Sequence, residues 1–250
     1  FIAPMAGASL IMPGPRLDGA SLYELMESER VTSTCGVPTV WLGLLQYLEA
    51  NNLTLHHLKR VLIGGAAAPR AMIQAFEDRG IAVTHAWGMT ELSPAGSMSA
   101  LKPPLEELPR ARQIDVLGKQ GYPLFGVEMT ITDDEGRARP RDGKSVGRLK
   151  VKGPAVAKAY FKGEGREAFD GHGWFDTGDV ASLDANGFMQ ITDRSKDVIK
   201  SGGEWISTIE IENLAVGHPD VAEAAAIGVP HPKWGERPLL IVVPKPGTSP

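Results

Sequence analysis

Asp179 and Arg194 stand on either side of a turn sequence at residues 184–187 (D-A-N-G), which joins two apolar runs. Such a turn predicts a hairpin, so we expect the two charged side chains near neighbouring strand ends, where they can point at one ligand. A carboxylate binds the vicinal hydroxyls of a ribose well, and a guanidinium suits a sugar or phosphate oxygen. A surface hairpin with an ordinary salt bridge explains the same residues equally well, because charged residues are common in turns.

A second candidate site follows the β-branched, apolar run at residues 59–64, which predicts a buried parallel strand. A turn of small residues comes next, and the segment 70–78 is then predicted to be a helix. In α/β folds this order of strand, small-residue turn and helix brings backbone close to a ligand at the carboxyl end of the strand. The alternative is a plain tight turn without a ligand.

The composition is typical of a globular protein with a mixed-charge surface. The chain has 250 residues, a formal net charge of −4, and 42% hydrophobic and 22% charged residues. This length allows one large or two small domains, and the charge argues against nucleic-acid binding, which needs a basic face. The single cysteine, Cys35, excludes an internal disulfide and a Cys-rich metal site, so we expect a cytoplasmic location. No apolar run reaches the length of a transmembrane helix.

Apolar periodicity and turn residues predict a mixed set of elements. Helices are expected at 19–29, 40–51, 70–78 and 207–216. Strands are expected at 9–12, 31–35, 59–64, 81–86, 127–132, 147–152, 188–192, 204–206, 221–228 and 238–244. Residues 93–117 are predicted to be a loop, because prolines recur in them.

Three motifs resemble those of the adenylate-forming superfamily, which includes acyl-CoA synthetases, amino-acid adenylation domains and luciferases. The first is Trp174–Asp179 (W-F-D-T-G-D), and the second is Asp193–Glu204 (D-R-x-K-D-x-I-K-x-G-G-E). The third is Trp87–Glu91 (W-G-M-T-E), which matches the aromatic-Gly-x-Thr-Glu pattern of the superfamily. Long motifs in the expected order are a more specific signal than a short glycine pattern.

The resemblance implies an α/β fold that corresponds to the C-terminal part of a large adenylate-forming domain, followed by the start of a small α+β domain. Residues 1–195 would belong to the large AMP-binding domain, with an α/β portion containing a parallel sheet at 1–117 and a β-rich subdomain at 118–195. Residues 196–250 would begin the small, mobile C-terminal domain. Lys196 would lie at the hinge between the two domains, where a few residues absorb the backbone rotation.

The resemblance also assigns the contacts with the adenine ring. Gly64, Gly65 and Ala66 would form a wall of the nucleotide site, because the matching segment of the superfamily lies against adenine. Trp87 could stack on the purine, with Gly88 beside it in the same motif. Without the motif, a core position would be the favoured interpretation of Trp87.

The remaining nucleotide contacts are assigned in the same way. Asp179 would hold the ribose, with Arg194 assisting. Thr90 would offer a hydroxyl to a phosphate, and Glu91 would offer a hard carboxylate oxygen to Mg²⁺. His85 would contact the carboxylate of the acyl substrate or simply pack in the core.

The implied enzyme is an AMP-forming acid–thiol ligase that uses ATP, Mg²⁺ and coenzyme A. It would activate a small carboxylic acid, such as a fatty acid or a short- or medium-chain acid, to acyl-AMP and then transfer the acyl group to CoA. Gly202 and Gly203 would line the path of CoA after rotation about Lys196. The segment 200–207 and the Met-Thr-Glu form of the third motif look most like fatty-acid or methylmercaptopropionate-type CoA ligases. A homo-oligomer is compatible with this interpretation.

Two parts of the superfamily's machinery have no counterpart in this sequence. They are a phosphate loop rich in Ser, Thr and Gly, expected upstream of Phe1, and a lysine near the superfamily's C-terminus. We therefore expect the 250 residues to be the middle and late part of a longer enzyme, and to be inactive alone. A non-catalytic module that binds a nucleotide or an acyl-adenylate is the main alternative, and another adenylate-forming enzyme is also compatible. An amino-acid adenylation domain would more often carry Gly-Pro-Thr-Glu and an amine-binding Asp, which are not seen.

Overall fold

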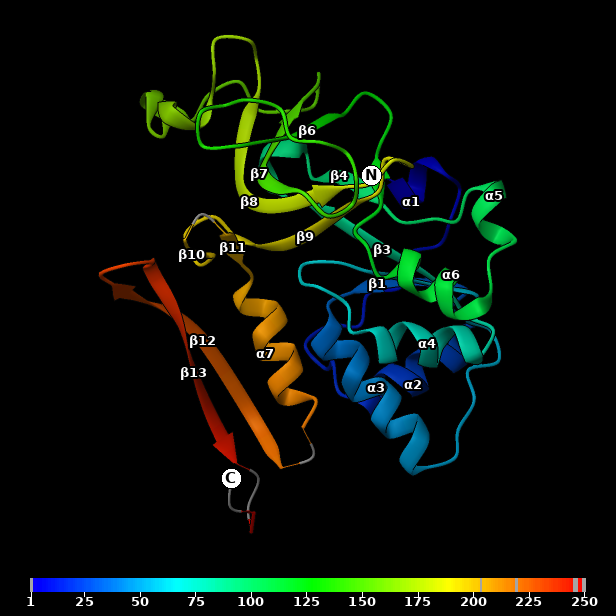
Figure 1. Cartoon of the computed structure of the whole chain (residues 1–250). Helices are drawn as coiled ribbons and strands as arrows, with labels where there is room; N and C mark the ends of the chain where they lie inside the picture. Colours follow the sequence, from blue (N-terminus) through cyan, green and yellow to red (C-terminus); the bar gives the residue numbers. More distant parts are fainter. Residues whose placement is uncertain (1, 203, 219, 245–246, 249–250) are drawn as a thin grey trace. The chain divides into compact units, whose positions relative to one another are not determined.

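The computed structural model describes residues 2–202, 204–218, 220–244 and 247–248 (Figure 1). The chain divides into two compact units. Unit 1 comprises Phe1–Thr90 and Pro94–Leu124, and unit 2 comprises Glu91–Ser93 and Phe125–Pro250. The domain boundary expected after residue 195 lies inside unit 2 and does not coincide with the division between the two units. That boundary stays a prediction.

Unit 1 is built on a five-stranded mixed sheet with the strand order β1-β2-β3-β4-β5. The first three strands are parallel, and the last two continue the sheet antiparallel. The strands are β1 (Ser33–Gly36), β2 (Arg60–Ile63), β3 (Ala82–Gly88), β4 (Ala95–Met98) and β5 (Tyr122–Pro123). The helices are α1 (Ile2–Met5), α2 (Gly19–Ser28), α3 (Pro38–Ala50), α4 (Arg70–Asp78), α5 (Pro103–Glu106) and α6 (Arg110–Leu117).

The helices of unit 1 begin where the sequence chemistry predicts. Asp18 caps α2, since its carboxylate accepts from the backbone N–H of Ser21 at 2.9 Å. Pro38 takes the first turn of α3, where its missing N–H costs little. Figure 1 shows α2, α3 and α4 grouped together, and their apolar faces share one core in which Trp41 meets Phe76 edge-to-face at 6.4 Å.

Two expectations for unit 1 were wrong. Residues 93–117 are not a loop, because they contain β4, α5 and α6. The prolines that suggested a loop stand at helix starts, with Pro103 in the first turn of α5 and Pro109 at the N-cap of α6. Residues 9–12 form no strand, and Leu10 and Met12 are 63% and 74% exposed, so they add nothing to the core.

Unit 2 contains a four-stranded antiparallel sheet with the order β6-β7-β8-β9 and a second sheet with the order β11-β10-β13-β12. The first sheet comprises β6 (Glu128–Thr132), β7 (Val146–Lys152), β8 (Phe175–Leu183) and β9 (Met189–Arg194). The second comprises β10 (Ile199–Ser201), β11 (Glu204–Ile206), β12 (Val221–His231) and β13 (Gly235–Pro244). The predicted hairpin at 184–187 is confirmed, since it joins β8 to β9 and Gly187 has a φ of +83°.

Short helices complete unit 2. They are α7 (Thr208–Val216) and the 3₁₀ turns η1 (Thr90–Leu92), η2 (Phe161–Gly163) and η3 (Arg166–Ala168), of which η1 begins in unit 1. Ser207 caps α7, because its hydroxyl accepts from the Glu210 N–H at 3.1 Å. The buried carboxylate of Asp193, in β9, also accepts from the backbone N–H and the hydroxyl of Thr208. The start of α7 is thereby tied to the end of β9.

Among the described residues, none of the helices combines the length and the apolar character needed to cross a membrane.

Candidate functional site

Asp179 and Arg194 lie directly opposite each other on β8 and β9, as the hairpin predicts. Their side chains form an ion pair with 2.9 Å between Asp179 Oδ1 and Arg194 Nη1. Arg194 is the last residue of β9, whereas Asp179 lies inside β8 and not near its end as expected. The Asp179 side chain is 4% exposed and that of Arg194 is 57% exposed, so the carboxylate is held inside the sheet and the guanidinium lies at the surface. The sheet therefore orients a carboxylate with very little freedom.

The residues just before Asp179 explain how β8 holds this geometry. Gly178 has a φ of +74°, a conformation that favours glycine, and the pairing of β8 with β9 shifts register close by. Thr177 accepts a hydrogen bond from the Asp179 N–H at 3.1 Å and donates its own to the Leu149 carbonyl. Asp176 pairs instead with Arg148 at 2.8 Å. The second carboxylate of the motif is therefore structural.

The glycine turn after β2 is formed in unit 1 as predicted. Gly65 has a φ of +79°, and a Cβ placed on it would lie 3.1 Å from Val37 Cγ1. A Cβ on Gly64 would lie 3.4 Å from the Ala86 carbonyl oxygen. Gly65 and Ala66 are exposed at the carboxyl end of a parallel strand, where this fold class places ligands.

His85 is completely buried in β3, and both ring nitrogens contact backbone atoms. Nδ1 lies 3.0 Å from the Gly118 carbonyl, and Nε2 accepts from the Ala68 N–H at 3.3 Å. This pattern fits a neutral ring with its proton on Nδ1. Burial lowers the pKa of His85 below its ordinary value, although its backbone hydrogen bonds oppose the shift. His85 thereby braces the end of the glycine turn through the hydrogen bond that it accepts from the Ala68 N–H.

Trp87 and Gly88 form the end of β3, next to β4. Trp87 is half-buried and pairs with Ser97 in the ladder. A Cβ on Gly88 would lie only 2.0 Å from the Pro94 carbonyl oxygen. The glycine is therefore required by the close approach of the backbone, whatever ligand binds nearby.

Glu91 has a partner that the sequence did not reveal. Thr90 ends the first stretch of unit 1 and is exposed, while Glu91 belongs to unit 2. The Tyr160 hydroxyl donates to Glu91 Oε1 at 2.5 Å. This hydrogen bond, with burial, raises the pKa of Tyr160 to about 12. The sequence offers one signal for this contact, which is the tyrosine of the Ala-Tyr-Phe segment at 159–161.

The residues expected to serve domain rotation and CoA lie beyond β9. Lys196 is exposed in the turn between β9 and β10. Gly202 has a φ of +60° and donates its N–H to the Trp234 carbonyl at 2.8 Å. Gly203, the other residue expected along the CoA path, lies outside the described residues.

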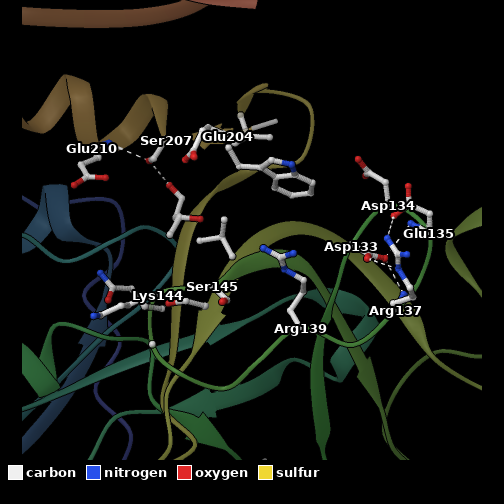
Figure 2. A pocket seen from close by; sticks show the side chains of 17 residues that line it. Asp133, Asp134, Glu135, Arg137, Arg139, Lys144, Ser145, Glu204, Ser207 and Glu210 are labelled. Carbon is white, nitrogen blue, oxygen red and sulfur yellow. Dashed lines mark hydrogen bonds and ion pairs between the residues drawn. The ribbon is translucent and has the colours of Figure 1, made fainter. Parts of the chain in front are cut away.

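Two cavities of unit 2 are separate from these residues. Figure 2 shows the first, of about 630 Å³, where Arg137 pairs with Asp133 and Glu135 on one side and Ser207 and Glu210 lie on the other. The second, of about 810 Å³, is bordered by 126–128, 152–158 and 169–173. None of the predicted site residues lines either cavity.

A glycine turn at a strand end and a buried carboxylate paired with an arginine are typical of a nucleotide-binding α/β protein. The family profile of AMP-binding enzymes matches residues 1–161. The profile of the AMP-binding enzyme C-terminal domain matches residues 210–250. The chain belongs to the AMP-binding enzyme family.

Curated relatives align over nearly the whole chain. A 3-methylmercaptopropionyl-CoA ligase of Ruegeria pomeroyi is 49% identical over 100% of this chain and 46% of its own length. A long-chain-fatty-acid–CoA ligase of Thermus thermophilus is 47% identical over 98% of this chain and 46% of its own length. A medium-chain-fatty-acid–CoA ligase of Ectopseudomonas oleovorans is 48% identical, with coverage of 100% and 46%. The chain thus spans about half the length of the curated relatives it matches.

Solved structures confirm the fold. An o-succinylbenzoate CoA synthetase from Bacillus subtilis, in complex with an acyl-adenylate intermediate, matches with a TM-score of 0.78 and 32% identity. The match covers 94% of this chain and 46% of that one. The expected α/β architecture of an adenylate-forming enzyme is therefore confirmed.

Proposed function

We propose that a protein containing these 250 residues is an AMP-forming acyl-CoA ligase. A carboxylate attacks the α-phosphate of ATP to give acyl-AMP and pyrophosphate, and the CoA thiol then displaces AMP. The observation that carries the proposal is the buried Asp179 carboxylate, held against Arg194 in a family whose members bind AMP. Relatives at 47–49% identity are named as CoA ligases, which supports the same reaction.

In this proposal Asp179 binds the ribose hydroxyls, because a fixed carboxylate accepts two hydroxyl hydrogen bonds without reorganisation. Arg194 keeps the Asp179 carboxylate oriented, and its exposed guanidinium faces nucleotide oxygens. Gly64, Gly65 and Ala66 provide backbone for the adenine edge.

Further members of the site follow from the motif around β3. Trp87 and Gly88 border the base. His85, held by backbone atoms on both ring nitrogens, supports the glycine turn through the Ala68 N–H, which corresponds to the packing role in place of a contact with the acyl carboxylate. Thr90 donates a hydroxyl to a phosphate.

Glu91 is suited to Mg²⁺ in the way that nucleotide enzymes use this ion. Among the described residues, no group of three or more His, Cys, Asp or Glu side chains could form an all-protein metal cage. Mg²⁺ commonly takes one or two carboxylates together with substrate phosphates and water, so a single Glu fits this role. When bound, the ion offsets the charge that develops on the phosphates.

The domain arrangement and the second half-reaction are part of the same proposal. Residues 1–195 form part of the large domain, and 196–250 begin a small domain that rotates about Lys196. Gly202 and Gly203 then border the path of CoA. A fatty or short- to medium-chain acid is the substrate class, as the names of the relatives suggest. A cytoplasmic location suits an enzyme that consumes ATP and CoA.

A panel of carboxylic acids tests the proposal. The full-length protein that contains these 250 residues is incubated with ATP, Mg²⁺ and CoA, and acyl-CoA and AMP are measured by mass spectrometry. We expect matched amounts of both products with at least one fatty acid. ATP binding without AMP release for any acid would contradict the ligase and favour a non-catalytic binding module.

A further inference from the structure

The contact between Tyr160 and Glu91 joins residues that are 69 positions apart in the sequence. The donor is the phenol O–H and the acceptor is Oε1 of the carboxylate, at 2.5 Å. A hydrogen bond to an ionised acceptor is shorter and stronger than one between neutral groups. Since the bond engages Oε1, it restricts rotation of the carboxylate and leaves Oε2 as the oxygen suited to an ion.

The backbone around Glu91 is held by the same segment, residues 155–160. The Ala157 N–H donates to the Glu91 carbonyl at 2.7 Å. The Ser93 hydroxyl donates to the Ala155 carbonyl at 3.0 Å. The segment thus holds the chain at the Glu91 carbonyl and at Ser93, and Tyr160 holds the Glu91 side chain itself.

The ring of Tyr160 is in turn set by two phenylalanines. It meets Phe169 edge-to-face at 5.5 Å and Phe175 at 6.3 Å, and these two rings lie 4.9 Å apart. Phe175 is 2% exposed at the start of β8, the strand that carries Asp179. A Cβ on Gly165 would lie 3.0 Å from the Tyr160 ring, so the glycine makes room for it. Tyr160 is 38% exposed, and these ring contacts orient its hydroxyl toward Glu91.

We propose that Tyr160 is a positioning residue that orients the Glu91 carboxylate as a ligand for a divalent cation. The proposal rests on the proposed function, in which Glu91 binds the Mg²⁺ of MgATP. Mg²⁺ demands near-ideal octahedral geometry, so a carboxylate free to rotate binds it less well than one held in a single orientation. Tyr160 acts on the ion through Glu91 and does not itself touch the substrate.

Tyr160→Phe tests this role because it removes the hydroxyl and keeps the ring that packs on Phe169 and Phe175. Calorimetric titration of ATP at a series of Mg²⁺ concentrations gives the concentration for half-maximal binding. We expect this Mg²⁺ concentration to rise roughly tenfold, the lower end of the effect of losing a hydrogen bond to a charged group. The KM for ATP at limiting Mg²⁺ should rise similarly, while kcat at saturating Mg²⁺ and the thermal midpoint change little. Tyr23→Phe, in unit 1, is the matched control and should leave the Mg²⁺ dependence unchanged.

A double mutant distinguishes positioning from general support of the fold. In a Glu91→Ala background, Tyr160→Phe should cause no further change in Mg²⁺ dependence, because the two residues act as one. An unchanged Mg²⁺ dependence in Tyr160→Phe, or an equal effect with and without Glu91, would overturn the proposal while leaving the ligase intact. If the ATP affinity of the wild-type protein does not depend on the Mg²⁺ concentration, the metal role of Glu91 is overturned, and this inference with it.

Discussion

The Asp179 carboxylate is nearly inaccessible although its partner, Arg194, is more than half exposed. Its identity as a candidate ligand could be predicted from the sequence, because the hairpin turn and the motif both pointed to it. Its burial could not be predicted, since that depends on the register shift between Val180 and Ala181 and on packing across the sheet. The same limit applied to Tyr160, whose hydroxyl contact depends on a loop that returns from β7.

Replacement of Asp179 by Ala should weaken ATP binding by about 1–3 kcal/mol through the lost ribose hydrogen bonds. Calorimetry with ATP measures the change. Glu135→Ala, which removes an exposed partner of Arg137, is the control and should leave the affinity unchanged. Equal affinities of wild type and Asp179→Ala would remove Asp179 from the site.

His85 gives a pH-dependent contribution to stability. Its pKa is lowered in the folded state, so the folded chain keeps the ring neutral while the unfolded chain binds a proton below about pH 6.5. The unfolded state then binds more protons, and the free energy of unfolding must fall as the pH drops from about 7 to 5, by at most about 1.4 kcal/mol per pH unit.

His85→Asn keeps a donor near Nδ1 but removes the titration. Urea unfolding of both proteins at several pH values should therefore show that the free energy of unfolding falls less steeply with decreasing pH in the variant than in the wild type. If wild type and His85→Asn lose stability in parallel, His85 does not carry this dependence.

At the scale of elements, the parallel strands and the α4 helix were predicted because apolar runs and small-residue turns alternate there. The helices α5 and α6 were missed, because Pro103 and Pro109 were read as helix breakers and not as helix starters. β4 was missed because its four residues, A-G-S-M, are small and carry little strand propensity.

Gly88→Ala should lower the free energy of unfolding by more than about 2 kcal/mol, because the added Cβ would overlap the Pro94 carbonyl. Gly43→Ala is the matched control, since nothing lies within 4 Å of its Cβ in α3. It should be neutral or raise the stability by up to about 1 kcal/mol. Chemical unfolding of both variants checks the contrast, and equal effects would show that β3 and β4 can move apart freely.

At the scale of the whole molecule, the family could be predicted from the three motifs, and the profile matches confirm it. The two compact units were not predicted in this form, because Glu91–Ser93 join the second unit through contacts with 155–160 that no local pattern reveals. The hinge at Lys196 stays a prediction. Lys196 lies in an exposed turn, which is compatible with a hinge at this position.

Lys196→Pro should separate the two half-reactions, since proline fixes φ near −65° and restricts rotation at the turn. We expect pyrophosphate release on acyl-AMP formation to continue and the transfer to CoA to slow by roughly tenfold or more. Lys196→Ala, which keeps backbone freedom, is the control and should retain both steps. Equal slowing of both steps by the proline would argue against a hinge at this position.

The central claim is that the carboxylic acid is activated by forming a bond to the α-phosphate of ATP. A carboxylate labelled with ¹⁸O tests it most directly, because thiol attack on acyl-AMP leaves one carboxylate oxygen on AMP. We predict AMP that carries one ¹⁸O atom and pyrophosphate without label. Acyl-CoA should form in the same amount as AMP and keep the other ¹⁸O atom in its thioester carbonyl. Release of ADP, or of AMP without the label, would contradict the account.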